Sequence, residues 1–185
     1  MITSNGLRPG MKILLDAAVY QVVEYQHHKP GKGGAIVRIK LKNLKTGAVV
    51  DRTFRPEEKV PLAEIEERKM QFLYRQEEMF HFMDTSNYEQ ISLRSDQLGS
   101  TTNYLKEGDT ISIQFHDEEP VDVVLPIFAE LKVTKTDPGV RGDTASGGSK
   151  PAMMETGMVI QVPLFIDVGD VVRVDTRSGT YVERG

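Results

Sequence analysis

The stretch Ile36-Val37-Arg38-Ile39-Lys40-Leu41-Lys42 decides the fold class of this chain. Apolar and basic side chains alternate along it, and successive side chains of a β-strand point to opposite faces of the sheet. The stretch therefore predicts a strand with one face in a hydrophobic core. The opposite face would carry a basic stripe, which we expect to contact RNA phosphates through Arg38, Lys40 and Lys42.

The residues just before that strand form a glycine-rich turn, which we call the finger. It reads Lys29-Pro30-Gly31-Lys32-Gly33-Gly34-Ala35. Glycine tolerates φ > 0 and adds no side chain to crowd a partner, while Pro30 fixes its own φ. The sequence therefore predicts that Lys32 stands at the end of a thin basic projection. A lysine ammonium there can bind phosphate or be modified, and an ordinary solvated turn is the alternative.

Short strand patterns with a period of two recur along the rest of the chain. They cover residues 49–54, 70–74, 79–83 and 89–93. Residues 95–106 could hold a short helix that ends at Gly108. Regular short strands separated by turns indicate β-barrels or β-sandwiches, so the predicted fold class is all-β.

A weak internal repeat favours barrels in series. The pairs Gly108-Asp109 and Gly169-Asp170 each precede an alternating strand, and they lie 61 residues apart. Similar turns that start similar strands indicate two similar small barrels, one after the other. One large sandwich is the alternative.

Charge and proline positions divide the chain into three parts. Residues 1–64 carry 11 Lys and Arg against 6 Asp and Glu, residues 65–127 carry 5 against 13, and residues 128–185 carry 7 against 8. Prolines interrupt the strand pattern over residues 56–61 and 120–126. We therefore expect three small β-barrels with these boundaries. The basic first part would meet a polyanion, and the acidic second part would stay clear of it.

The longest stretch of low hydrophobicity runs over residues 136–152. A loop of this length inside a compact domain often serves a function. Its glycines, hydroxyls and cations could place backbone N–H groups against phosphates or base edges. The candidate contact residues are Arg141, Gly142, Asp143, Thr144, Gly147 and Gly148. A surface loop without a partner is the alternative.

Several classes of function find no support in the sequence. The absence of cysteine excludes disulfides, thiolate nucleophiles and cysteine metal sites. His27 and His28 are adjacent and have no companion at metal-ligand spacing, so we expect no metal site. The acidic pairs have no His or Lys base nearby that would make them catalytic carboxylates. We therefore expect a protein that is not an enzyme and needs no cofactor.

The sequence also carries no pattern for export or for a membrane. Residues 1–7 lack an apolar segment behind a basic start, and no apolar run approaches the length that spans a bilayer. Together with the absence of cysteine, this predicts a cytoplasmic protein without a membrane partner.

Two long motifs resemble the bacterial elongation factor P family. They are the finger and the end of the long loop, Gly142-Asp143-Thr144-Ala145-Ser146-Gly147-Gly148-Ser149-Lys150-Pro151-Ala152. Residues 171–182 also look like the family's ending, so the resemblance covers the full chain. It implies an N-terminal SH3-like (KOW-type) barrel followed by two OB-fold barrels, in an L-shaped arrangement that imitates a tRNA.

The resemblance also implies a function on the 70S ribosome. Such a factor would bind beside peptidyl-tRNA, contact ribosomal RNA and ribosomal proteins, and stimulate peptide bond formation at consecutive prolines. The residues that would face peptidyl-tRNA are Lys29, Pro30, Gly31, Lys32, Gly33 and Gly34. Lys32 would reach the acceptor end and would be the candidate for modification by an enzyme. The loop residues Gly142 to Gly148 would lie on the small-subunit side.

We expect this factor to act as a monomer. The alternative is a paralogous or other barrel-type RNA-binding protein that acts in ribosome assembly or transcription. A close paralogue should depart from the sequence Lys-Pro-Gly-Lys-Gly at residues 29–33, which this chain keeps.

Overall fold

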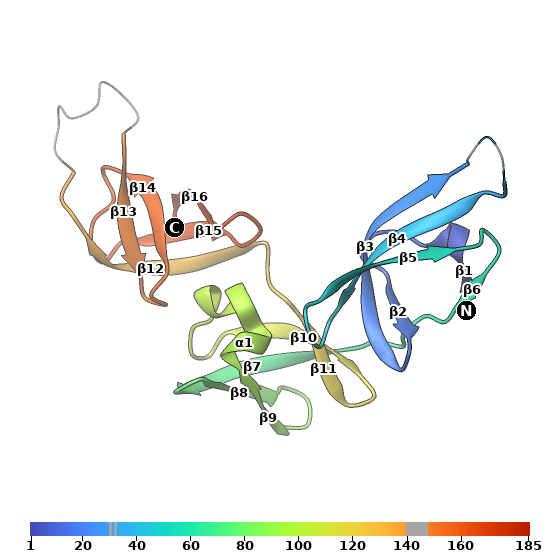
Figure 1. Cartoon of the computed structure of the whole chain (residues 1–185). Coiled ribbons are helices and arrows are strands. Elements are labelled where there is room, and N and C mark those ends of the chain that lie inside the picture. The colour runs from blue at the N-terminus through green and yellow to red at the C-terminus, as the bar shows by residue number, and fades with distance from the viewer. Residues whose placement is uncertain (30, 32, 140–147) are drawn as a thin grey trace. The chain divides into compact units, whose positions relative to one another are not determined.

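The computed structural model describes residues 1–29, 31, 33–139 and 148–185, and the fold of these residues is all-β (Figure 1). Helical structure in this part of the chain is confined to η1 (Ser4–Gly6), α1 (Ser95–Leu98) and η2 (Gly99–Tyr104). None of these described helices is long and apolar enough to cross a membrane. The all-β class predicted from the sequence is confirmed.

The N-terminal sheet has four strands in the order β2-β3-β4-β5. The strands are β2 (Lys12–Leu15), β3 (Ala18–His28), β4 (Ile36–Asn43) and β5 (Val49–Phe54). Val37, Ile39 and Leu41 of β4 are fully buried, as their alternation predicts. They form one hydrophobic core with Leu7, Ile13, Val22, Phe54 and Val60.

A short ladder pairs β1 (Ile2–Thr3) with β6 (Lys59–Val60). β6 lies where prolines interrupt the sequence pattern, and a strand of two residues is too short to show alternation. The sequence therefore did not predict it. The amide of Ala63 donates to the carbonyl of Lys12 at 3.0 Å, so the pairing with the N-terminal strands continues past residue 60.

The other two sheets share one topology. Their strand orders are β11-β10-β7-β8-β9 and β14-β13-β12-β15-β16. In each sheet the first strand is central, with the second and third strands on one side and the fourth and fifth on the other. The strands are β7 (Glu66–Gln76), β8 (Met79–Asp84), β9 (Gln90–Arg94), β10 (Thr110–His116), β11 (Glu119–Val124), β12 (Phe128–Thr136), β13 (Ser149–Met154), β14 (Val159–Pro163), β15 (Val171–Asp175) and β16 (Thr180–Arg184). Two similar barrel-like sheets in series, as predicted, account for this order.

The Gly-Asp repeat has the same backbone geometry in both places. Gly108 has a φ of 90° and Gly169 a φ of 94°, in the region that favours glycine. The amide of Gly108 donates to the carbonyl of Phe72 at 2.8 Å, and the amide of Phe72 donates to the carbonyl of Asp109 at 2.8 Å. The equivalent bonds 61 residues later measure 2.9 and 2.8 Å, with Val133 in the place of Phe72. The repeat is therefore one hydrogen-bonded turn that the chain uses twice.

Two elements differ in detail from the sequence prediction. The expected break at residues 120–126 is partly strand, because β11 contains Pro120 and continues to Val124. β11 is the last strand of its sheet, where a residue without an N–H group is tolerated. The helix expected over residues 95–106 is a single α-turn, α1, followed by the 3₁₀-helix η2.

The chain divides into two compact units. One consists of Met1–Arg68 and Ile113–Asp122, and the other of Lys69–Ser112 and Val123–Gly185. The boundaries between the units fall inside β7, β10 and β11. The three domain ranges expected from the sequence, 1–64, 65–127 and 128–185, stay predictions.

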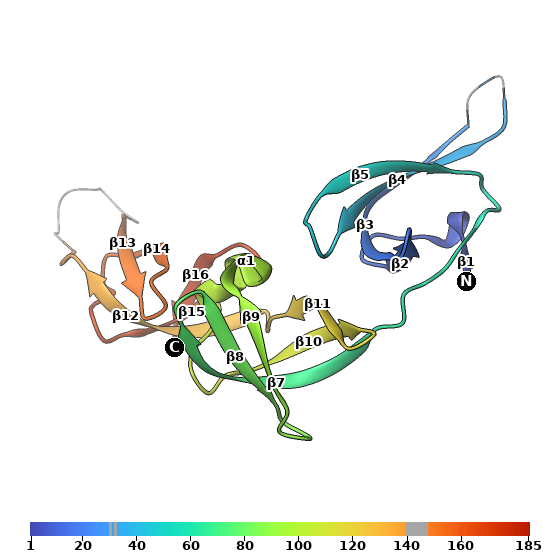
Figure 2. The ribbon, with the colours of Figure 1, turned by 60° about the horizontal axis from the view of Figure 1, so that its bottom comes forward.

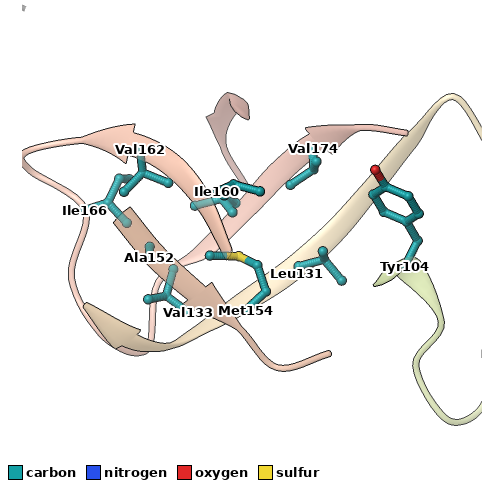
Figure 3. Packing of buried hydrophobic residues seen from close by; sticks show 10 residues of the cluster. Tyr104, Leu131, Val133, Ala152, Met154, Ile160, Val162, Ile166 and Val174 are labelled. Atoms are coloured by element: carbon teal, nitrogen blue, oxygen red, sulfur yellow. The ribbon is translucent and has the colours of Figure 1, made fainter. Parts of the chain in front are cut away.

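Tyr104 of η2 packs into the hydrophobic core of the C-terminal sheet (Figure 3). Its side chain is 7% exposed, and its ring points toward Leu131 and Val174. The hydroxyl of Thr156 donates to the carbonyl of Asn103 at 2.6 Å, which also ties η2 to this part of the chain. Burial, with a smaller contribution from Asp175, raises the pKa of the Tyr104 phenol.

We predict that Tyr104→Ala lowers the free energy of unfolding by about 3 to 5 kcal/mol, because it removes a ring from a packed core. Tyr104→Phe keeps the ring and should cost less than half of that. Because the folded state raises the pKa of Tyr104, the native protein should also lose stability as the pH rises above about 10, and the Phe variant should lack this contribution. Urea unfolding at several pH values measures both effects. Wild-type stability of the Ala variant would show that the ring does not support this core.

Candidate nucleic-acid interface

β3 and β4 form the stem of the finger. Their antiparallel ladder continues to the pair His28–Ile36, the last pair before the finger. β5 pairs with β4 only as far as Val37, so the end of the stem consists of two strands. Figures 1 and 2 both show this hairpin projecting from the rest of its sheet. The stem therefore carries the finger away from the N-terminal core.

The described finger residues leave room for a partner. Lys29, Gly31, Gly33 and Gly34 are all exposed. A Cβ atom added to any of the three glycines would meet nothing within 4 Å, and only Gly33 is held to glycine by its φ of 116°. Packing inside the described part of the chain therefore does not require glycine at residues 31 and 34. Pro30 and Lys32, which were also predicted at this site, lie outside the described residues.

The basic stripe on β4 points outward, as the alternation predicts. Arg38 and Lys42 are exposed, and Lys40 is half-buried. Their neighbours in the chain, Ile39 and Leu41, are fully buried on the opposite face. The orientation of the stripe is confirmed, and its contact with RNA stays a prediction.

Two carboxylates that the sequence analysis did not single out flank this stripe. The strand register places Glu24 of β3 and Asp51 of β5 on either side of Lys40. The Lys40 ammonium forms an ion pair with Glu24 at 3.5 Å, and the amide of Gln26 donates to the other Glu24 carboxylate oxygen at 2.8 Å. Both carboxylates could have been identified from the register of the β3–β4 and β4–β5 pairs. The alternation within β4 alone does not contain that register.

A further cation near the finger was also missed. Arg8 is exposed, and its guanidinium lies 5.2 Å from the centre of the Tyr25 ring. Its Nη1 atom donates to the carbonyls of Asn5 at 2.9 Å and Leu7 at 2.7 Å. These contacts hold the Arg8 side chain against β3, beside the stem of the finger.

The long loop is shorter than predicted. β12 continues to Thr136, and β13 begins at Ser149, so residues 149–152 of the expected loop are strand. Lys150, Ala152 and Met154 form the buried face of β13. The sequence pattern hid this strand because lysine at a buried position breaks the apparent alternation of polar and apolar residues.

Both ends of this loop are held in place. Lys150 is only 6% exposed, and its ammonium donates to the carbonyl of Asp137 at 2.6 Å. A Cβ atom added to Gly139 would overlap the carbonyl oxygen of Leu164. Glycine at residue 139 is therefore required for close packing, a role that the sequence analysis did not identify.

Of the residues predicted to make contacts in the loop, Gly148 is among the described residues. Arg141, Gly142, Asp143, Thr144 and Gly147 lie outside the described residues. Gly148, the remaining candidate, is half-buried next to the start of β13. The predicted contacts of this loop on the small-subunit side stay predictions.

Apart from that of Tyr104, the perturbed pKa values belong to ion pairs. Hydrogen bonds to Glu66 and then to Glu118 raise the pKa of Arg68, and its guanidinium also lies 4.4 Å from the centre of the Phe115 ring. Hydrogen bonds from Arg177 lower the pKa of Asp175 to about 2. These groups stay charged and paired near neutral pH. Among the described residues, no group of three His, Asp or Glu side chains gathers so that it could hold a metal ion.

Three family models match the chain in order along its length. Residues 3–60 match the elongation factor P (EF-P) KOW-like domain, residues 65–123 the elongation factor P (EF-P) OB domain, and residues 129–184 the C-terminal part of elongation factor P. The chain belongs to the elongation factor P family. The resemblance that the finger and the long loop indicated is therefore confirmed.

Known elongation factor P proteins are similar to this chain over its whole length. The protein from Moorella thermoacetica is 54% identical over 184 residues, which cover 100% of both chains. That from Natranaerobius thermophilus is 53% identical over 184 residues, which cover 100% of this chain and 98% of the relative. Among solved structures, the eukaryotic translation initiation factor 5A from Methanococcus jannaschii has a TM-score of 0.58 at 22% identity. It matches 66% of this chain and 90% of its own, and at that identity it shows a shared fold.

In this elongation factor P family member, Gly139→Ala should lower the free energy of unfolding by about 1 to 3 kcal/mol, because the new methyl group overlaps the Leu164 backbone. Gly31→Ala is the matched control, since the same methyl group would meet nothing within 4 Å there. We expect the control to stay within about 0.5 kcal/mol of the native protein. Urea unfolding of the two variants compares them directly. Equal stabilities would mean that the contact of Gly139 with Leu164 does not restrict this position.

Proposed function

We propose that this elongation factor P family member binds the ribosome beside peptidyl-tRNA and stimulates peptide bond formation at consecutive prolines. In this proposal Lys32 lies at the acceptor end of the tRNA. Family membership supports a role in translation elongation. The ribosomal site, the dependence on proline and the position of Lys32 are the proposed parts.

The observation that carries the proposal is the construction of the finger. A stem of two paired strands ends at His28 and Ile36. The exposed residues of the finger include Lys29, and also Gly31 and Gly34, where the described fold does not require glycine. A narrow element without bulky side chains can enter a crowded RNA site, where lysine ammonium groups follow phosphates. Lys32 belongs to this finger by its place in the sequence.

The proposed mechanism is positioning. Proline reacts slowly in peptide bond formation, because its secondary amine and its ring restrict the reacting geometry. A factor that holds the tRNA acceptor end in place lowers the entropic part of the barrier without donating a catalytic group. The protein would therefore act as a translation factor that assists the ribosome, and not as an enzyme.

The remaining parts of the proposal follow from this role. The factor would be a cytoplasmic monomer with three barrel domains in an L-shaped arrangement, in contact with ribosomal RNA and ribosomal proteins. The loop with Asp143 and Thr144 would lie on the small-subunit side. Lys32 would be the residue that a modifying enzyme extends, and the mass of the intact protein from its native host would reveal such a group.

We predict that Lys32→Ala slows the synthesis of Pro-Pro sequences by about tenfold or more relative to the native protein, because a missing group at the reacting end loses the gain from positioning. The measurement is the rate of dipeptide formation in a reconstituted translation system. Folding should be unaffected, since surface substitutions usually change stability by less than about 0.5 kcal/mol.

Lys45→Ala is the matched control for this experiment. Lys45 is an exposed lysine in the turn at the other end of β4, so its loss changes the net charge equally without touching the finger. Messages without proline runs should respond to neither variant. Full activity of Lys32→Ala on Pro-Pro sequences would refute the proposed role of the finger.

For the basic stripe, we predict that Arg38→Ala and Lys42→Ala each weaken binding to 70S ribosomes. Each lost phosphate contact should reduce the slope of log affinity against log salt by roughly one unit. Lys40→Ala should have a smaller effect, because Glu24 already partly neutralises this ammonium at 3.5 Å. Titrations at several salt concentrations test this order, and unchanged slopes for all three variants would remove the stripe from the RNA-facing surface.

A further inference from the structure

The outward face of the N-terminal sheet has alternating charge, although the sequence of β4 alone predicts a basic face. Lys40 stands between Glu24 on β3 and Asp51 on β5. The neighbouring positions on the same face of β4 are Arg38 and Lys42, two residues away on each side. An acid-base-acid row therefore separates the two exposed cations.

Part of this face forms a hollow of about 200 Å³. It is lined by Glu24, Gln26, Arg38, Lys40 and Asp51. Within the described part of the chain, neither the Arg38 nor the Asp51 side chain makes a hydrogen bond or an ion pair. The face thus presents an available cation and an available anion in one hollow.

The carboxylates are close enough to affect a phosphate at either cation. Strand residues rise by about 3.3 Å each, so the acid-base-acid row lies about 7 Å along β4 from Arg38 and from Lys42. Electrostatic screening at physiological ionic strength has a length of about 8 Å. A phosphate bound at Arg38 or Lys42 is therefore repelled by the nearby carboxylates, while the Lys40 charge is partly cancelled by Glu24.

Folding offers little reason for this arrangement. Lys40 and Glu24 have side-chain exposures of 43% and 48%, and an exposed ion pair of this kind contributes little to stability. Asp51 is exposed as well, so an uncharged polar residue would serve the fold equally. Both acids lower the affinity of this face for any polyanion, which points to a role in partner specificity.

We propose that Glu24 and Asp51 are specificity-determining residues of this surface. They lower its affinity for arbitrary polyanions, so that strong binding requires RNA that places phosphates at Arg38 and Lys42, on either side of the acid-base-acid row. This inference rests on the proposed function, in which the same face contacts ribosomal RNA. It adds repulsion of unsuitable RNA to the attraction expected from the basic stripe.

The test compares binding to poly(U) with binding to 70S ribosomes. Glu24→Gln and Asp51→Asn should each bind poly(U) about three- to tenfold more tightly at low salt, because each removes a repulsive charge near the cations. The ratio of ribosome affinity to poly(U) affinity should fall by a similar factor. Glu57→Gln is the matched control, since it changes the net charge equally at an acid outside the hollow. It should change the ratio by less than about twofold.

The double variant Arg38→Ala, Lys42→Ala separates this inference from the proposed function. If the double variant weakens ribosome binding while Glu24→Gln and Asp51→Asn behave like the control, the face binds RNA and the inference about the acids is wrong. If the double variant binds ribosomes and poly(U) like the native protein, the face does not contact RNA and the inference fails, while the proposed role of the finger is decided separately by Lys32→Ala. Melting curves of all variants exclude effects of unfolding.

Discussion

The antiparallel ladder between β3 and β4 connects the N-terminal core, the finger and the outward charged face. Each pair in the ladder decides which side chains of the two strands lie on the same face of the sheet. The pair Val22–Leu41 is buried in the core, and a register shift at Val23 then places Glu24, in the place of Val23, opposite Lys40. A shift of one residue would bury Lys40 and expose Leu41. Burial of a few apolar side chains therefore sets the positions of the charges, and the same ladder carries the finger at its end.

A second constraint organises the remaining two sheets. The turns at Gly108-Asp109 and Gly169-Asp170 connect back to the central strand of each sheet through the same pair of backbone hydrogen bonds. In both sheets the fourth strand, which follows this turn, lies beside the central strand. The long loop is inserted into the C-terminal sheet between β12 and β13, where Lys150 and Gly139 hold its two ends. Loops held on a rigid scaffold are a common place for binding residues.

The sequence predictions failed where local signals were absent. The turns at Asp16-Ala17 and Asp117-Glu118 contain no glycine, although all four residues have φ values between 49° and 66°. Hairpin turns of this kind are usually recognised by Asn-Gly or Asp-Gly, so these two gave no signal. Strand pairing on both sides of such a turn compensates for the strained backbone. β6 was missed because a strand of two residues is too short to show alternation, and the first residues of β13 were missed because the buried Lys150 breaks the alternation.

The sequence by itself determined the all-β class, the buried and exposed faces of β4, the repeated turn and the family to which the chain belongs. Each of these depends on alternation, spacing or motifs within one segment. Only the tertiary structure decided that Glu24 and Asp51 flank Lys40, that Lys150 is buried, and that Gly139 packs against Leu164. These facts depend on which strands meet and in which register. Many registers are compatible with one strand's pattern, and the packing of the whole core selects among them.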